Sequence, residues 1–258
     1  MKRLESIAST LDEAARQGKP VPQFTGDDLL STEEAYAVQQ ISVGRRHQRG
    51  ERPVGYKMGL TSRAKMQQVG VSDVIWGRLT DHMRVEDGGI IDLNGCVHPR
   101  AEPEIAFLIG GRLSGNVSIA EAMSAVVGIC PAIEIIDSRY ENFKFALGDV
   151  IADNTSACRF VLGPWSSPAT DIANLGMILE IDGKTVAVGS SAGILGHPGR
   201  ALVAAARMIG NQNLALEPGD ILLAGAATEA FPIRDARSVR ATVQKLGSTA
   251  FQIAQKPD

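Results

Sequence analysis

The sequence is short of cysteine, of net charge and of long hydrophobic runs, and each shortage excludes a class of protein. Its three cysteines, Cys96, Cys130 and Cys158, form no CxxC pair, so we expect reduced thiols and not a disulfide framework. A formal net charge of -3 argues against nucleic acid as a partner, because nucleic-acid-binding proteins usually carry a strongly basic face. No apolar stretch reaches membrane-spanning length, so we expect no membrane association. Acidic residues stand where a signal peptide would carry its apolar core, which predicts a cytoplasmic protein.

Common catalytic and cofactor motifs are missing as well. His98 and His197 each precede a proline and stand in no HxH or HxxxH spacing, so we interpret both as structural. The chain has no Walker loop, no GxGxxG after a strand and no Gly-x-Ser-x-Gly elbow. Nucleotide binding and serine-hydrolase chemistry are therefore poorly supported. No context marks a lowered thiol pKa, so a catalytic cysteine is unsupported too.

The hydrophobic pattern predicts an α+β fold. Apolar residues recur at helical steps over residues 1–17, and a second helix is expected over 31–48. Beyond these, strands are expected at 53–59, 89–92, 103–110, 131–137, 158–163, 176–181, 184–189, 220–224, 238–245 and 248–253, and helices at 119–127 and 197–210. We therefore predict a helical N-terminal lobe, residues 1–52, on a β-rich catalytic body, residues 53–258. Scattered short strands indicate a mixed β-roll or sandwich and not βαβ winding.

Three glutamates lie inside apolar, strand-like runs. Glu102 and Glu104 belong to the segment AEPEIAFLI, and Glu134 belongs to ICPAIEII. Residues two apart in a strand point to the same face, so Glu102 and Glu104 should lie side by side. An ionised carboxylate buried without a partner is very costly, and no nearby run of Lys or Arg can neutralise all three. The pattern therefore predicts a hard divalent metal, magnesium or manganese, bound by carboxylates.

Lys57 and Asp81 are further residues that could carry chemistry. Lys57 stands between two glycines in GYKMGLTS, where exposed backbone N–H groups could bind an anion. The alternative is a surface lysine before a turn. Asp81 follows the segment WGRLT, and most acids in such places only cap a turn.

Three further polar segments are open to more than one interpretation. The segment IADNTSA (151–157) either caps turns or binds substrate. The segment AGAAT (224–228) either cradles a carboxylate with backbone N–H groups or packs tightly. Asp137 and Arg139 would share a strand face and could pair with each other.

These segments together resemble one family. GYKMGLTS (55–62), WGRLTDHM (76–83), HPRAEPEIAF (98–107), PAIEIIDSRYENFKF (131–145), VIADNTSACRFVLG (150–163) and LLAGAAT (222–228) are similar to those of the 2-keto-4-pentenoate hydratase and 2-oxo-3-hexenedioate (4-oxalocrotonate) decarboxylase family. This family belongs to the fumarylacetoacetate-hydrolase superfamily, so the resemblance implies that mixed β fold. SRYENFKF, ADNTSACRF and AGAAT are closer to the decarboxylase branch.

The resemblance implies a site and a reaction. Glu102, Glu104 and Glu134 match the family's metal ligands, with Mg²⁺ or Mn²⁺ as cofactor, and Lys57 matches its active-site lysine. The implied reaction is metal-dependent decarboxylation of 2-oxo-3-hexenedioate to 2-hydroxypenta-2,4-dienoate and CO₂, in meta-cleavage degradation of aromatic compounds. Candidate contacts to this dicarboxylate substrate are Leu60, Thr61, Ser156 and Thr228, with Arg139 or Lys144 for the distal carboxylate.

Two alternatives remain from the sequence. The same metal site and lysine would serve a hydratase that adds water to 2-hydroxypentadienoate. A non-catalytic subunit that stabilises a partner enzyme would have less reason to keep three glutamates and a lysine. The resemblance also implies a homo-oligomer and a possible complex with the pathway hydratase.

Overall fold

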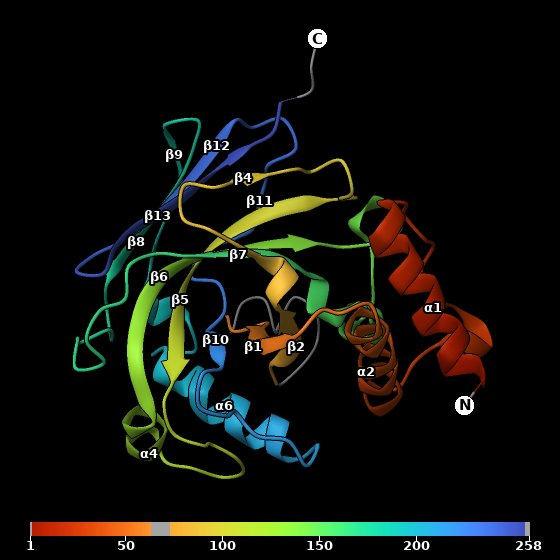
Figure 1. The fold of residues 1–258 in the computed structure, drawn as a ribbon, viewed down its shortest axis with the longest axis horizontal. Helices are drawn as coiled ribbons and strands as arrows, with labels where there is room; N and C mark the ends of the chain where they lie inside the picture. Colours follow the sequence, from red (N-terminus) through yellow and green to blue (C-terminus); the bar gives the residue numbers. More distant parts are fainter. Residues whose placement is uncertain (1, 63–72, 256–258) are drawn as a thin grey trace.

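Two N-terminal helices pack against each other along one side of the molecule. The computed structural model describes residues 2–62 and 73–255. Helix α1 (Lys2–Gln17) contacts α2 (Thr32–Gln48), and the pair stands beside the β structure (Figure 1). Ser31 caps α2, because its side chain accepts a hydrogen bond from Glu34 N while the Glu34 carboxylate accepts one from Ser31 N.

The larger sheet has eight strands and positions the candidate site. Its order is β2 (Ile75–Thr80), β1 (Pro53–Gly59), β10 (Ile221–Leu223), β5 (Pro99–Ile109), β6 (Val126–Asp137), β7 (Ala157–Leu162) and β3 (Arg84–Val85), and β11 (Phe231–Pro232) also pairs with β5. The long antiparallel pair of β5 and β6 lies at its centre and is almost wholly buried. Strands buried on both faces read as continuous apolar runs, which is why the glutamates in them stand out.

The smaller sheet has five strands and covers one end of the larger one. Its order is β4 (Ile90–Ile91), β13 (Gly247–Ile253), β12 (Ser238–Val243), β8 (Gly176–Ile181) and β9 (Lys184–Ser190). Figure 1 shows it stacked against β5 and β6. Ile133 and Ile135 of β6 belong to the same buried hydrophobic cluster as Val239 and Phe251. Curled together in this way, the two sheets enclose the site on one side.

Short helices fill the remaining sides. They are α4 (Ile119–Ser124), α5 (Leu147–Ala152) and α6 (Gly199–Gly210), with 3-10 turns η1 (Gly26–Asp28), η2 (Asp81–Met83), η3 (Glu141–Phe143), η4 (Asn154–Ser156) and η5 (Ser191–Gly193). Helix α6 buries Ala201, Leu202 and Ala205 and packs on α4. In residues 2–62 and 73–255 no helix is both long and apolar enough to cross a membrane.

The α+β prediction is confirmed, with local differences. Strands at 53–59 and 176–181 have the predicted bounds. The predicted helix 119–127 ends at Ser124, because β6 already begins at Val126. Strand β2 and helix α5 were not predicted at all. The division at residue 52 into a lobe and a body stays a prediction.

Candidate metal centre and active site

The register of β5 and β6 brings the three predicted glutamates together. Glu102 lies directly opposite Glu134, and Glu104 follows two residues further along β5 on the same face. The three side chains offer carboxylate oxygens that all lie within 4.8 Å of one another, and all three residues are buried. Like charges directly opposite in a sheet repel, so this arrangement needs a compensating cation.

The electrostatics of the cluster fit a metal ion. Burial and the neighbouring Glu134 raise the pKa of Glu104 well above its usual range, and burial also raises the pKa of Glu134. Within the described residues, Oε1 of Glu104 and Oε1 of Glu134 have no hydrogen-bond partner although both atoms are buried. Buried polar atoms normally have a partner, and an all-oxygen ligand set suits a hard divalent cation.

Lys57 supplies one positive charge to the cluster. Its Nζ lies 3.0 Å from Oε2 of Glu134 and donates a hydrogen bond to the Thr155 carbonyl at 3.1 Å. Burial alone would lower the pKa of Lys57, but the three carboxylates outweigh burial and raise it, so the amine is charged. The ammonium of Lys57 offsets only part of the charge of three ionised carboxylates.

A glycine in the AGAAT segment holds Glu104 in place. Gly225 N donates a hydrogen bond to Oε2 of Glu104 at 2.8 Å, so the expected carboxylate cradle binds a carboxylate of the protein itself. Gly225 has φ +102, and a Cβ there would stand 2.2 Å from Oγ1 of Thr61. Both the backbone conformation and the close approach therefore require glycine.

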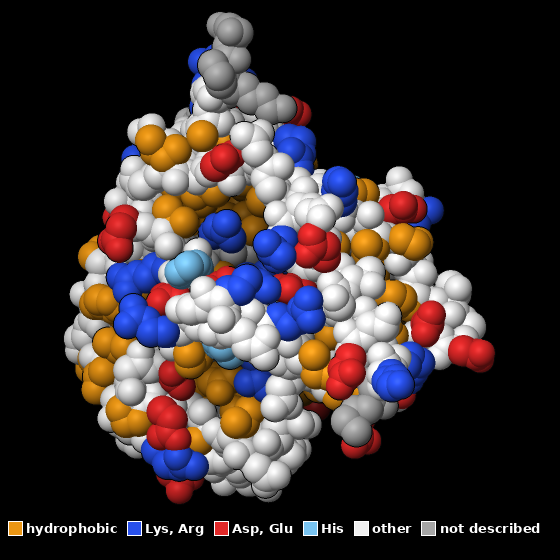
Figure 2. All heavy atoms as spheres, turned by 45° about the vertical axis from the view of Figure 1, so that its right-hand side comes forward, with side chains coloured by type: hydrophobic (Ala, Val, Ile, Leu, Met, Phe, Trp, Pro, Cys, Tyr) orange, Lys and Arg blue, Asp and Glu red, His pale blue; other side chains and the backbone are white. Residues whose placement is uncertain are grey.

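A pocket opens over this cluster. Of the predicted residues, those that line it are Lys57, Leu60, Thr61, Glu102, Ser156 and Thr228. Leu60 and Ser156 both have positive φ, and Ser156 ends a run of three such residues. On the face drawn in Figure 2, Lys and Arg side chains gather around a hollow, with Asp and Glu among them.

Two predicted residues, Asp81 and Lys144, lie outside both the carboxylate cluster and the pocket lining. Asp81 accepts hydrogen bonds from the backbone N and Nε of Arg52 at the surface, so it acts as a turn cap. Lys144 is exposed, and it does not line the pocket although its neighbours Phe143 and Phe145 do. The structure therefore removes Asp81 and Lys144 from the candidate site.

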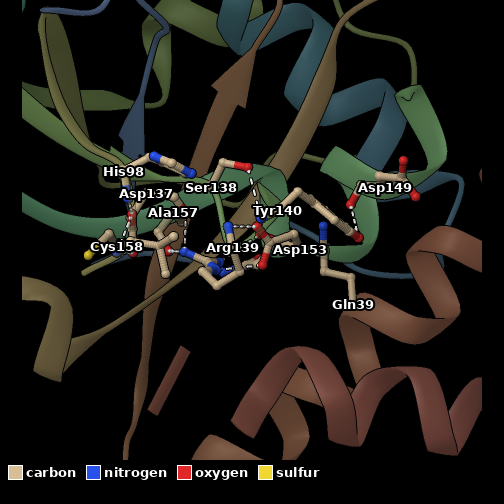
Figure 3. A network of polar contacts seen from close by, with 12 residues as sticks. Gln39, His98, Asp137, Ser138, Arg139, Tyr140, Asp149, Asp153, Ala157 and Cys158 are labelled. Carbon is tan, nitrogen blue, oxygen red and sulfur yellow. Dashed lines mark hydrogen bonds and ion pairs between the residues drawn. The ribbon is translucent and has the colours of Figure 1, made fainter. Parts of the chain in front are cut away.

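Arg139 is a buried structural residue (Figure 3). Its Nε lies 2.5 Å from Oδ1 of Asp153, and its Nη atoms bind the backbone carbonyls of Asp137, Asp153 and Ala157. It does not line the pocket, and its guanidinium is held by these partners, so it is not placed to bind a substrate. The side-chain pair with Asp137 considered above is not formed, because the Asp137 carboxylate accepts backbone N–H groups of Val97 and His98.

Arg100 lines the pocket and was missed from the sequence. Its Cζ lies 4.0 Å from the centroid of the Phe143 ring, and Nη1 makes only a long contact of 3.5 Å with the Ala230 carbonyl. In the described part of the chain no acidic side chain pairs with it. Arg100 precedes Glu102 by two residues on β5, so the alternation that identified the glutamates also placed this arginine on their face.

Comparison with known proteins identifies the family. Residues 58–254 match the model of the fumarylacetoacetate (FAA) hydrolase C-terminal domain. The chain belongs to the fumarylacetoacetate hydrolase family, which agrees with its curled mixed sheets and its carboxylate cluster.

Individual relatives place the chain within that family. It is 57% identical to a 4-oxalocrotonate decarboxylase from a Pseudomonas species, over 96% of this chain and 97% of the relative. It is 36% identical to the 2-keto-4-pentenoate hydratase of Paraburkholderia xenovorans LB400, over 86% of this chain and 84% of the relative. A solved structure of 4-oxalocrotonate decarboxylase from Pseudomonas putida G7, complexed with magnesium and adipate, superposes with a TM-score of 0.94 at 33% identity, covering 98% of each chain. The chain is thus more similar to this decarboxylase than to this hydratase.

Proposed function

We propose that the protein is a magnesium-dependent decarboxylase that converts 2-oxo-3-hexenedioate to 2-hydroxypenta-2,4-dienoate and CO₂. The observation that carries this proposal is one pocket lined both by Glu102, a member of the carboxylate triad, and by Arg100, which lies on the same strand face. Such a pocket offers separate places for the two ends of a dicarboxylate. The 57% identity to a 4-oxalocrotonate decarboxylase supports the same substrate.

Glu102, Glu104 and Glu134 are the proposed metal ligands. A divalent ion held there would supply a Lewis acid for the oxygen of the 2-keto group. The identity of the ion as magnesium is supported by the magnesium bound in the relative from Pseudomonas putida G7, although the same enzyme also has a structure with calcium. Gly225 donates its N–H to one oxygen of Glu104 and so helps to fix the orientation of that ligand.

Lys57 is the proposed proton carrier. When CO₂ leaves, the electron pair of the broken C–C bond moves through the double bond to the 2-keto oxygen. The ammonium of Lys57, held by Glu134 and the Thr155 carbonyl, faces the cluster as a fixed positive charge and as a proton source for the dienolate. Because the lysine and its partners are buried, water screens this charge little.

Arg100 is the proposed partner of the distal carboxylate. Its guanidinium lies over Phe143, which fixes its plane, and the strand places its Cα about 7 Å from that of Glu102. Arg100 replaces Arg139 and Lys144 in this role. Leu60, Thr61, Ser156 and Thr228 are proposed to line the space between the two ends of the substrate.

Turnover of 2-oxo-3-hexenedioate, followed by ultraviolet absorbance and CO₂ release with Mg²⁺ and then with EDTA, tests the function. We expect CO₂ release that EDTA abolishes. Hydration of 2-hydroxypentadienoate without CO₂ release would instead assign the protein to the hydratases, to which it is also similar. No turnover of either compound would favour a non-catalytic subunit.

Binding of adipate, a dicarboxylate, tests the role of Arg100. Replacing Arg100 with Met should weaken adipate binding by about 10- to 150-fold, the range expected for a hydrogen bond to a charged group. Pyruvate, which lacks a distal carboxylate, should bind nearly as before. Lys144→Met is the matched control and should change neither affinity, because Lys144 lies outside the pocket. Equal losses for both ligands would contradict the assignment.

Self-association, a complex with the pathway hydratase and a cytoplasmic location are also proposed. They rest on the family resemblance.

A further inference from the structure

Two of the three cysteines are in contact beside the Asp137 end of β6. Sγ of Cys96 lies 3.8 Å from Sγ of Cys158, with 7% and 8% of the two residues exposed. Cys96 precedes β5 in a turn, and Cys158 belongs to β7. The third cysteine, Cys130, is fully buried on β6 opposite Ala106.

Local structure turns these two sulfurs toward each other. The pairing of β6 with β7 shifts by one residue at Cys158, because Ile135 opposes Arg159 whereas Ile136 opposes Ala157. Such a β-bulge redirects the side chain of its extra residue. On the other side, the Asp137 carboxylate accepts the N–H groups of the two residues after Cys96 and fixes that turn (Figure 3).

The charges around the pair favour a reactive sulfur at Cys158. The Cys96 thiol, which donates a hydrogen bond to its sulfur, lowers the pKa of Cys158, and Arg159 adds to the effect with Nη1 3.9 Å from that sulfur. Burial and the Asp137 carboxylate oppose this shift without reversing it. A thiolate is the nucleophile in cysteine oxidation, so Cys158 is the sulfur that reacts first.

We propose that Cys96 and Cys158 form an oxidant-sensitive pair that a peroxide converts to an intramolecular disulfide. The Cys158 thiolate attacks one oxygen of hydrogen peroxide, breaking the O–O bond and leaving a sulfenic acid and, after protonation, water. The Cys96 sulfur then attacks the sulfenic sulfur, the S–S bond forms and a second water leaves. Two thiols are oxidised and one peroxide is reduced.

The pair is better suited to this bond than to a metal ion. Asp137 also offers a carboxylate oxygen within 4.8 Å of both sulfurs, so these three residues could together hold a metal ion. Both of its oxygens, however, already accept backbone N–H groups of Val97, and one of them also that of His98. Among the described residues, the two sulfurs make polar contacts only with each other and with Arg159. Formation of an S–S bond therefore breaks fewer contacts than binding a metal would.

The cross-link would span the candidate site. In the sequence, all three glutamates and Arg139 lie between residues 96 and 158. One S–S bond would therefore close a covalent loop of the chain that contains β5 and β6. Disulfides in reducing compartments are usually transient and redox-sensing, and a reductant should therefore reverse this one.

The test is a cysteine count on the purified full chain after treatment with hydrogen peroxide. The protein is alkylated in denaturant, and its peptides are mapped without reduction. We expect one alkylated cysteine in place of three, a peptide that links Cys96 to Cys158, and full recovery of three thiols after reduction. Three alkylated cysteines after peroxide, or a link that involves Cys130, would overturn the proposal.

Variants and an unfolded control sharpen the result. Cys96→Ser and Cys158→Ser should each abolish the link, whereas the matched control Cys130→Ser should keep it. In urea the wild-type link should form much more slowly, because the fold no longer holds the sulfurs together. An equal rate in urea would show that the native geometry is irrelevant. Mapping of the wild-type protein decides the question even if a variant does not fold.

Discussion

Replacing Glu104 with Gln separates the electrostatic cost of the carboxylate cluster from its packing. Glutamine has nearly the same size, and its side-chain oxygen can still accept the hydrogen bond from Gly225 N. The substitution removes one of three negative charges and one proposed metal ligand. It should therefore stabilise the metal-free protein and weaken its response to magnesium, two effects of opposite sign.

The size of the first effect follows from the geometry. Two unit charges separated by 4.8 Å, the upper limit for the ligand oxygens, repel by about 3 kcal/mol at an effective dielectric constant of ~20. Because the raised pKa of Glu104 means that part of this repulsion is already relieved by protonation, we expect a gain of roughly 1–3 kcal/mol. For a protein of this size that corresponds to a rise in Tm of about 3–10 °C.

Thermal unfolding in EDTA and at several magnesium concentrations measures both effects. The wild-type Tm should rise with magnesium, because an ion that binds only the folded state stabilises it. The Glu104→Gln protein should start higher and gain little. Glu229→Gln is the matched control: Glu229 is exposed at the pocket and outside the triad, so its Tm and magnesium response should match the wild type.

A metal-free Glu104→Gln protein that melts below the wild type would refute the electrostatic reasoning. An undiminished magnesium response would refute the metal assignment. The two failures are distinguishable, because the electrostatic effect is measured as the Tm in EDTA and the metal effect as the rise of Tm with magnesium concentration.

Three further predictions concern pH and two residues outside the site. Because the pKa of Glu104 is raised, metal binding must displace a proton, so magnesium affinity should fall as pH falls; calorimetry in two buffers of different ionisation enthalpy would detect the released proton. Asp81→Asn should leave turnover unchanged and shift the urea unfolding midpoint little, since it alters only a surface turn cap and the pair with Arg52. Arg139→Met should cost about 3–5 kcal/mol in the same assay by stranding the buried Asp153 carboxylate, with KM of the folded enzyme unchanged.

The metal cluster was predictable because its signal is local. Glu102, Glu104 and Glu134 stand in runs that only a buried strand explains, and strand alternation fixes the relative side of the first two. What the sequence could not provide was the register that sets Glu102 opposite Glu134. The two strands are separated in the sequence by a helix and a turn, so their pairing is not set by a short hairpin loop.

Strand β2 was missed because a glycine interrupts its apolar run. Gly77 lies opposite Lys57, and a Cβ there would stand 2.6 Å from the Asn154 carbonyl oxygen and 3.2 Å from Cδ of Lys57. The glycine thus makes room for the lysine and for the backbone that binds it. A glycine in a strand often marks such an approach, but its neighbours are known only once the chain is folded.

The cation now proposed for the distal carboxylate lies in a different segment from the predicted ones. Arg139 and Lys144 follow the third glutamate in sequence, which suggested proximity, yet one is saturated by Asp153 and the other faces solvent. Arg100 was within reach of the same argument that paired Glu102 with Glu104. Strand periodicity was therefore the better guide here than closeness in sequence.

All three proposed ligands come from a single antiparallel pair of strands, and this has a consequence for folding kinetics. A divalent ion bound to these glutamates would hold β5 and β6 together reversibly. Chevron plots at low and high magnesium would then show whether β5 and β6 pair before or after the folding transition state. Faster refolding with magnesium means that the two strands are paired in the transition state, whereas slower unfolding alone means that they pair afterwards.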